Sequence, residues 1–450
     1  MAKLVNPAEL ELLAETLDTL QQGYADLPPF ETDFDTDAAA AVLAEVATKM
    51  QDNYPYFHPQ YAGQMLKPPH PVARIAYAMA LWINPNNHAL DGGRASSALE
   101  KECIVDLGRL YGWEQPLGHL TSGGTMANLE ALWVAGTLQP GKRIVASEQA
   151  HYTHSRISSV LKLPFTSIPV DQAGRMDCSA LERELEAGDV GTVVATIGTT
   201  GLGAVDPLPA LLELRERHGF RIHADAAYGG YFGLCESLAP ATRSSFDRLA
   251  EVDSIVVDPH KHGLQPYGCG CVLFRDASVG KIYLHDSPYT YFSSEELHLG
   301  EISLECSRAG AAATALWATM RLLPLERGGE FSTLLEQCLS AARRFHAKLK
   351  ASPAFVPLYE PELDIVVYAV SAADTATSAR QARRLFERAA AKELHLALIE
   401  LPTRALGDRL GPIEINSETV TCLRSVLMKP EQEDWIDRIV ALLEEAAAEL

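Results

Sequence analysis

The chain has 450 residues with 47% hydrophobic content, which is enough to bury a large core and usually to form more than one domain. Its net charge of −21, from 38 basic and 59 acidic side chains, argues against nucleic acid or an anionic membrane as partner, because phosphate groups need a basic surface. Eight scattered cysteines, no signal peptide and no apolar run near the roughly 18–20 residues of a membrane span predict a cytoplasmic protein.

Helical and strand-like stretches follow one another in a regular order. Amphipathic spacing predicts helices over 6–22 and 37–53, and alternating elements from about 60 to 310 indicate a mostly parallel sheet between helical layers. The expected strands of this sheet are 118–121, 143–146, 166–168, 192–197, 221–224, 254–257 and 269–274. After a helical stretch near 310–350, short strands and helices predict a smaller C-terminal α+β domain. The expected division is 1–60, 61–325 and 326–450.

A glycine turn precedes the helix expected after the first strand. Gly123 and Gly124 let the backbone approach an anion, and Thr125 adds a hydroxyl at the helix N-terminus. The free N–H groups and the dipole of such an end favour phosphate binding. Gly-Gly turns before helices are common, so this segment alone is weak support for a phosphate site.

Two charged residues follow expected strands of the same sheet, Asp225 after 221–224 and Lys261 after 254–257. Ligand-contacting residues gather at the carboxyl ends of strands in open α/β sheets, so both side chains can converge on one crevice. A lysine can bond an aldehyde, and a carboxylate can keep a pyridine nitrogen protonated, which indicates pyridoxal 5′-phosphate as cofactor. The alternatives are a solvated loop lysine and a helix N-cap aspartate.

Taken together and in this order, the segments resemble the pyridoxal-phosphate-dependent group II amino-acid decarboxylases, which include the aromatic-amino-acid, histidine, glutamate and archaeal tyrosine/aspartate enzymes. The likeness runs from about residue 54 to about 321 and is strongest around the lysine, at Ser254, Ile255, Lys261, His262, Gly263, Tyr267 and Cys269. It implies an aspartate-aminotransferase-like (fold-type I) α/β fold with a seven-stranded sheet. It also implies a homodimer with active sites at the subunit interface. The N-terminal segment 1–60 of each subunit would pack on the partner subunit.

The resemblance assigns roles to single residues. Lys261 would bond the cofactor aldehyde, Asp225 would pair with the pyridine nitrogen, and His151 would stack on the ring and handle protons. Further expected contacts are Ala227 beneath the ring, Gly124, Thr125 and His260 at the phosphate, Thr200 near the reacting groups and Arg308 at the substrate carboxylate. His151 could instead be a surface residue or pair with His154 on a metal, but no further ligand has zinc-site spacing, so no metal is expected. Arg308 could instead pair with Glu301 or Glu305.

Two tyrosines complete the expected site, and two other residues differ from the family pattern. Tyr289 and Tyr291 lie where the family carries a loop tyrosine that returns a proton after decarboxylation, and Tyr291 is slightly favoured; packing is the alternative. Met126 stands where many relatives have an acidic residue, and Asp258 where animal enzymes have a phosphate-binding asparagine. Because a carboxylate would repel phosphate, we expect Asp258 to point elsewhere.

The expected activity is decarboxylation of an L-amino acid to its amine and CO2. Two groups of residues lie where relatives form the side-chain pocket: Lys67, His70 and His88 would suit an acidic substrate, and Tyr54, Tyr56, Phe57 and Trp82 an aromatic one. The aromatic class is narrowly favoured. The alternatives are an aldehyde synthase or aminotransferase on the same scaffold, or a non-catalytic relative that binds the cofactor.

Overall fold

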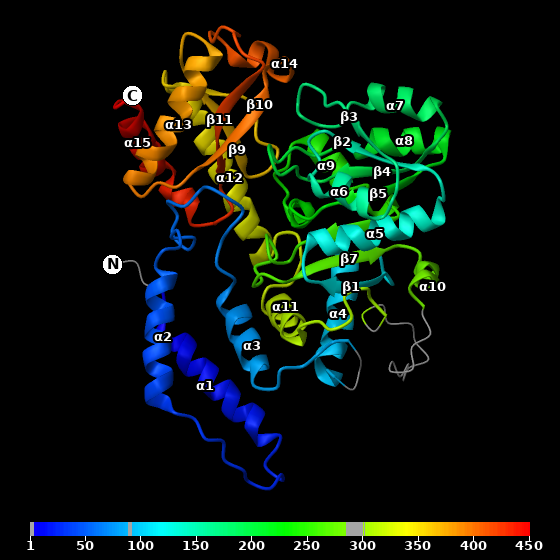
Figure 1. The fold of residues 1–450 in the computed structure, drawn as a ribbon, viewed down its shortest axis with the longest axis vertical. Helices are drawn as coiled ribbons and strands as arrows, with labels where there is room; N and C mark the ends of the chain where they lie inside the picture. The colour runs from blue at the N-terminus through cyan, green and yellow to red at the C-terminus, as the bar shows by residue number, and fades with distance from the viewer. Residues whose placement is uncertain (1–3, 89–91, 285–299, 301) are drawn as a thin grey trace.

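The larger of two sheets has seven strands in the computed structural model, which describes residues 4–88, 92–284, 300 and 302–450 (Figure 1). In spatial order they are β1 (Leu117–Thr121), β7 (Gly270–Phe274), β6 (Ser254–Val257), β5 (Arg221–Asp225), β4 (Val190–Thr196), β2 (Arg143–Ser147) and β3 (Phe165–Ile168). β7 is antiparallel to its neighbours β1 and β6, and the other neighbouring strands are parallel. The predicted mostly parallel sheet is confirmed.

The central strands are apolar on both faces because helices cover both faces. Ile255 and Val257 of β6 point into the largest core, whereas Val256 between them packs with residues of α5 on the opposite side. Such continuous burial is typical of parallel strands between helical layers. The helices of this unit are α3 (Pro71–Leu81), α4 (Arg94–Leu110), α5 (Gly124–Leu138), α6 (Thr153–Val160), α7 (Cys178–Glu186), α8 (Leu208–His218), α9 (Pro240–Phe246), α10 (Gly280–Tyr283) and α11 (Gly310–Leu322).

The smaller sheet is antiparallel and lies beside the larger one (Figure 1). Its strands, in spatial order, are β10 (Ala397–Pro402), β11 (Thr419–Val426), β9 (Ile365–Val370) and β8 (Phe355–Pro357). Alternate residues of β9 divide between two cores: Val366 and Tyr368 pack under the C-terminal helices, and Val367 joins the large core. The helices here are α12 (Glu330–Ala351), α13 (Thr375–Ala391), α14 (Thr403–Leu406) and α15 (Gln432–Ala447). The predicted smaller α+β unit is confirmed, and the boundaries at 60 and 325 stay predictions.

The first two helices, α1 (Pro7–Gln22) and α2 (Thr36–Met50), project from the body of the molecule (Figure 1). The side chains of Asn6 and Asp35 cap their N-termini, and neither helix contains a buried residue. Large apolar side chains are nevertheless exposed along them and on the segment that joins them: Leu10, Leu12, Tyr24, Leu27, Phe30, Phe34, Val42, Leu43, Val46 and Met50. An exposed apolar surface of this extent is typical of an interaction site.

Membrane-spanning helices were not expected. Within the described ranges, no helix combines the length and the apolar character that a membrane span requires.

Candidate functional site

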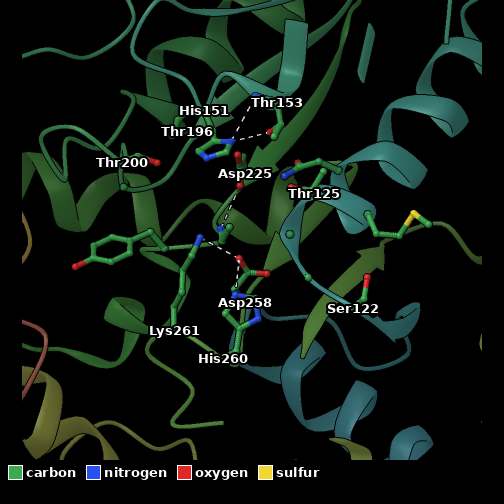
Figure 2. A pocket seen from close by; sticks show the side chains of 17 residues that line it. Ser122, Thr125, His151, Thr153, Thr196, Thr200, Asp225, Asp258, His260 and Lys261 are labelled. Atoms are coloured by element: carbon green, nitrogen blue, oxygen red, sulfur yellow. Dashed lines mark hydrogen bonds and ion pairs between the residues drawn. The ribbon is translucent and has the colours of Figure 1, made fainter. Parts of the chain in front are cut away.

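A cavity of about 300 Å³ lies where the carboxyl ends of β4, β5 and β6 meet the start of α5 (Figure 2). Parallel strands end at one edge of a sheet, so the residues that follow them face a common space. All residues predicted to contact the cofactor line this cavity: Gly124, Thr125, His151, Thr200, Asp225, Ala227, His260 and Lys261. In the view of Figure 2, His151 and Asp225 lie above Lys261, Asp258 and His260.

Lys261 belongs to a turn that directly follows β6. Its backbone N–H donates to the Asp258 carbonyl (2.9 Å), and its Nζ lies 2.9 Å from Asp258 Oδ2. Asp258 is buried, and its Oδ1 has no hydrogen-bond partner among the described residues. The expectation that Asp258 points elsewhere is therefore wrong: its carboxylate lines the cavity and holds the lysine amine there.

Asp225 is the last residue of β5, and its carboxylate has two hydrogen-bond partners among the described residues. Oδ2 lies 2.7 Å from His154 Nε2, and Oδ1 accepts a hydrogen bond from the Ala227 N–H (3.2 Å). Burial by itself raises the pKa of Asp225, but the hydrogen bond from His154, together with the electrostatic effects of His154, His223 and Lys261, outweighs burial and leaves this pKa below its usual value. The carboxylate is therefore ionised at neutral pH, as a partner for a protonated ring nitrogen must be.

His151 enters the cavity from the turn before α6. The backbone N–H of Thr153 donates to its Nδ1 (3.4 Å), and the Thr153 hydroxyl lies 2.8 Å from the same atom. Burial lowers the pKa of His151, with smaller and opposing effects of nearby charges. A neutral ring that accepts at Nδ1 carries its proton on Nε2 and can pack against an aromatic ring.

The glycine turn before α5 forms the opposite end of the cavity. A Cβ at Gly124 would lie 2.7 Å from Asp258 Oδ2, so this close approach requires glycine. His260 faces the turn, its Nδ1 has no partner within the described part of the chain, and burial lowers its pKa. The free N–H groups of the helix start, the Thr125 hydroxyl and this ring nitrogen fit a phosphate group, although Asp258 adds a negative charge beside them.

The cavity as a whole fits pyridoxal phosphate. It holds an amine for an aldehyde, an ionised carboxylate for a ring nitrogen, a small side chain at Ala227 and a helix start for a phosphate. Four further cavities lined by described residues lack this combination of groups.

Arg308 lies outside this cavity. Its guanidinium pairs with Glu100 (2.5 Å) and donates to three backbone carbonyls, those of Asn87, Leu120 and Gly300. Among the described residues its acidic partner is thus Glu100, and Glu305 instead accepts a hydrogen bond from the Ser122 N–H. With these donors occupied, a contact between Arg308 and a substrate carboxylate is not apparent in the structure, and that role stays a prediction.

The remaining expected residues fall into two groups. Tyr289, Tyr291 and Glu301 lie outside the described residues. None of the residues expected to recognise the substrate side chain lines the cavity in the single chain: Lys67, His70, His88, Tyr54, Tyr56, Phe57 and Trp82. Lys67 instead donates to the Met428 carbonyl, and His70 caps the N-terminus of α3.

Sequence reasoning missed three further residues. His154 was considered only as a metal ligand, yet it bonds to Asp225. Tyr228 lines the cavity, and its hydroxyl donates to Asp364 Oδ1 (2.5 Å), which ties the cavity wall to the start of the smaller sheet. The one available signal was spacing, because His154 follows the predicted site residue His151 by only three positions; His151 precedes α6, and His154 is the second residue of that helix.

The family model and three of the relatives that match this chain are all named as decarboxylases. The conserved domain of pyridoxal-dependent decarboxylases matches residues 25–371. A probable L-tyrosine/L-aspartate decarboxylase of Methanothermobacter thermautotrophicus is 32% identical over 309 residues, which cover 68% of this chain and 82% of that protein. The L-aspartate decarboxylase of Thermococcus kodakarensis is 29% identical over 332 residues (73% and 83% covered), and the L-tyrosine decarboxylase of Enterococcus faecium is 28% identical over 434 residues (72% and 71% covered).

Solved structures share the fold. Mouse CSAD in its apo form superimposes with a TM-score of 0.78 at 21% identity and covers 98% of this chain and 99% of its own. Oryza sativa TDC with PLP and tryptamine gives a TM-score of 0.80 at 17% identity and covers 100% and 99%. At these identities the likeness establishes the fold alone, which confirms the expected fold type.

Proposed function

Because this chain belongs to the family of pyridoxal-dependent decarboxylases, we propose that the cavity around Lys261 is its cofactor site, at which an aromatic or acidic L-amino acid loses CO2 and becomes the amine. The observation that carries this proposal is the convergence of Lys261, Asp225, His151 and the start of α5 on one cavity. Bound pyridoxal phosphate supplies an electron sink for the pair that remains when CO2 leaves.

Each side chain that lines the cavity would have its own role toward the cofactor. The Lys261 amine would hold the cofactor through its aldehyde. Ionised Asp225 would keep the ring nitrogen protonated, and neutral His151 would pack against the ring. Gly124, Thr125 and His260 would hold the phosphate.

Thr200 and Ala227 also line the cavity, and we propose that they support the ring and the reacting groups. Tyr291, or else Tyr289, would return the proton to the carbon that lost CO2.

The substrate class rests on the relatives. Those named above act on tyrosine, on aspartate or on both, according to their names. Among the described residues, none of those expected to form an acidic or aromatic side-chain pocket lines the cavity, so we propose that this pocket is completed by the second subunit. Of the two classes, we favour the aromatic narrowly.

A homodimer is the second part of the proposal. Helices α1 and α2 have no buried residue and expose apolar side chains that a second copy would cover. A cytoplasmic location, as expected from the sequence, is consistent with eight unpaired cysteines.

A cofactor spectrum followed by a panel of L-amino acids tests the proposal. We expect a visible band of the lysine-bound cofactor that is lost in Lys261→Ala and kept in Lys350→Ala, which changes an exposed lysine on α12. We also expect CO2 and amine from aromatic or acidic substrates. Peroxide or a keto acid would indicate the aldehyde synthase or aminotransferase. A bound cofactor without turnover of any amino acid would indicate the non-catalytic relative.

A further inference from the structure

A buried histidine stands behind the carboxylate that faces the cavity. His154 is the second residue of α6 and does not line the cavity, but its Nε2 lies 2.7 Å from Asp225 Oδ2. The two side chains are only 1% and 6% exposed. His154 is therefore shielded from bulk water, Asp225 meets solvent only through the cavity, and the contact joins the first turn of α6 to the end of β5.

The contact matters because of where Asp225 lies. A buried carboxylate is favoured as the neutral acid unless hydrogen bonds or opposite charge compensate for the lost water. The Ala227 N–H donates over a longer distance, 3.2 Å, so His154 is the closer of the two partners. Oδ1 keeps lone-pair capacity toward the cavity while Oδ2 is held from behind.

A second buried histidine shows how specific this contact is. His223 lies on β5 with its ring centre 6.4 Å from that of His154. Its two nitrogens are within hydrogen-bond distance of Ser254 Oγ (2.9 Å) and Asn128 Oδ1 (2.8 Å), and burial lowers its pKa to about 3. His223 is therefore neutral and bonded elsewhere, although it is as buried as His154.

We infer that His154 is a positioning residue for the cofactor: through its hydrogen bond it keeps Asp225 ionised and directed at the ring nitrogen. The inference rests on the proposed role of Asp225. Without His154, Asp225 would lose its shortest hydrogen bond, and burial would shift it toward the neutral acid, which cannot hold a proton on a pyridine nitrogen by charge. The ring would then be a weaker electron sink.

The test compares His154→Phe, which removes the donor, with His154→Gln, which keeps an N–H at a similar reach. His223→Gln is the matched control, because it changes a buried histidine that does not bond to Asp225. Two readouts are used on the purified apoprotein: the Kd for pyridoxal phosphate from the visible band, and the ¹⁵N NMR shift of ring-labelled [¹⁵N]pyridoxal phosphate, which reports protonation of its nitrogen. Tm is recorded for each variant.

For His154→Phe we expect cofactor binding to weaken roughly tenfold or more, as for the loss of a hydrogen bond to a charged group, and the ring-nitrogen signal to move toward the unprotonated value. His154→Gln should recover most of the cofactor affinity and most of the wild-type ring-nitrogen signal. His223→Gln should leave the ring-nitrogen signal unchanged. Wild-type Kd and nitrogen signal in His154→Phe would overturn the inference. So would equal changes in His223→Gln, since these would indicate a general packing effect.

Asp225→Asn separates this inference from the proposed function. If Asp225→Asn shifts the nitrogen signal and His154→Phe does not, the inference alone fails. If Asp225→Asn leaves the signal unchanged, the role of Asp225 fails and the inference with it. If the wild-type protein forms no visible band, the proposed cofactor site itself is wrong.

Discussion

At the scale of single residues, the cavity places a carboxylate where a phosphate is proposed to bind. Asp258 Oδ2 contacts the Lys261 amine and lies against the glycine turn, and Oδ1 faces no donor of the described chain. The Asp258 carboxylate and a phosphate bound at the glycine turn would both be negative and would repel each other, and the low polarity of a buried site strengthens the repulsion. Asp258 thus holds the lysine at a cost to phosphate affinity.

We expect Asp258→Asn to bind pyridoxal phosphate several-fold to roughly tenfold more tightly at neutral pH, because the amide keeps an oxygen for Lys261 and loses the charge. Titration of the apoprotein with cofactor measures the effect. Weaker binding in the variant would instead mean that the charge of Asp258 is needed to keep Lys261 in place.

A second residue lies away from the cavity and makes stability depend on pH. Lys429 is buried, its Nζ donates to the Tyr61 carbonyl (2.7 Å), and burial lowers its pKa to about 7. Between this value and the ordinary lysine value near 10.5, the unfolded chain binds more protons than the folded chain. The free energy of unfolding contributed by Lys429 therefore rises with pH across that window and is flat below it.

Lys429→Met isolates this contribution. The wild-type protein should gain stability relative to the variant between pH 7 and pH 10, on the order of a few kcal/mol, because only the wild type loses a proton on folding. Gln432 Nε2 still donates to the Tyr61 carbonyl in the variant, so this acceptor keeps a partner. Urea unfolding of both proteins across this range measures the difference. A difference that stays constant with pH would contradict the lowered pKa.

At the scale of elements, the start of α5 shapes one end of the cavity. Its first residue must be glycine, because a Cβ on Gly124 would lie 2.7 Å from a carboxylate oxygen of Asp258. Gly270 on β7 is similarly close to the turn, where a Cβ would lie 2.6 Å from Gly123 Cα. Two elements therefore approach each other at glycines and leave room for an anion at the helix N-terminus.

Gly124→Ala should weaken cofactor binding by roughly tenfold or more, since the added methyl group displaces Asp258 and enters the space proposed for the phosphate. Gly233→Ala is the control, because its nearest new contact is an ordinary 3.4 Å with the Phe246 ring. Equilibrium dialysis with pyridoxal phosphate distinguishes the two variants. Equal affinities would mean that the phosphate does not bind at this turn.

At the scale of the whole molecule, α2 presents an apolar stripe to the surface. Leu43, Val46 and Met50 follow one another at helical spacing, and all three are exposed. A stripe of this kind on a helix without a buried residue requires a partner, and the proposed dimer supplies one.

Leu43→Lys combined with Met50→Lys should shift the protein toward the monomer by at least about tenfold in dissociation constant, because charge is placed where apolar side chains would be buried. Thr48→Lys adds a charge on the opposite side of the same helix and should leave the dimer intact. Sedimentation velocity at micromolar concentration measures both. A wild-type protein that sediments as a monomer would contradict the proposed homodimer interface.

Local sequence patterns were sufficient to predict the class of fold and the eight expected cofactor contacts that line the cavity. Apolar strands that lead directly into Asp225 and Lys261 are local patterns, and a parallel sheet necessarily brings its carboxyl ends to one edge. The glycine turn before α5 is equally local, since its chemistry depends on neighbouring residues. For these residues, pattern and topology are sufficient.

Only the tertiary structure decided which buried polar groups meet. The pairs His154 with Asp225, Arg308 with Glu100 and Tyr228 with Asp364 join residues that lie 71, 208 and 136 positions apart. Such pairs depend on how helices and strands pack. Because a buried polar group without a hydrogen bond is unfavourable, each group pairs with the partner that the packing places beside it. No periodicity or spacing encodes that choice, so the residues that orient the cavity became visible only in three dimensions.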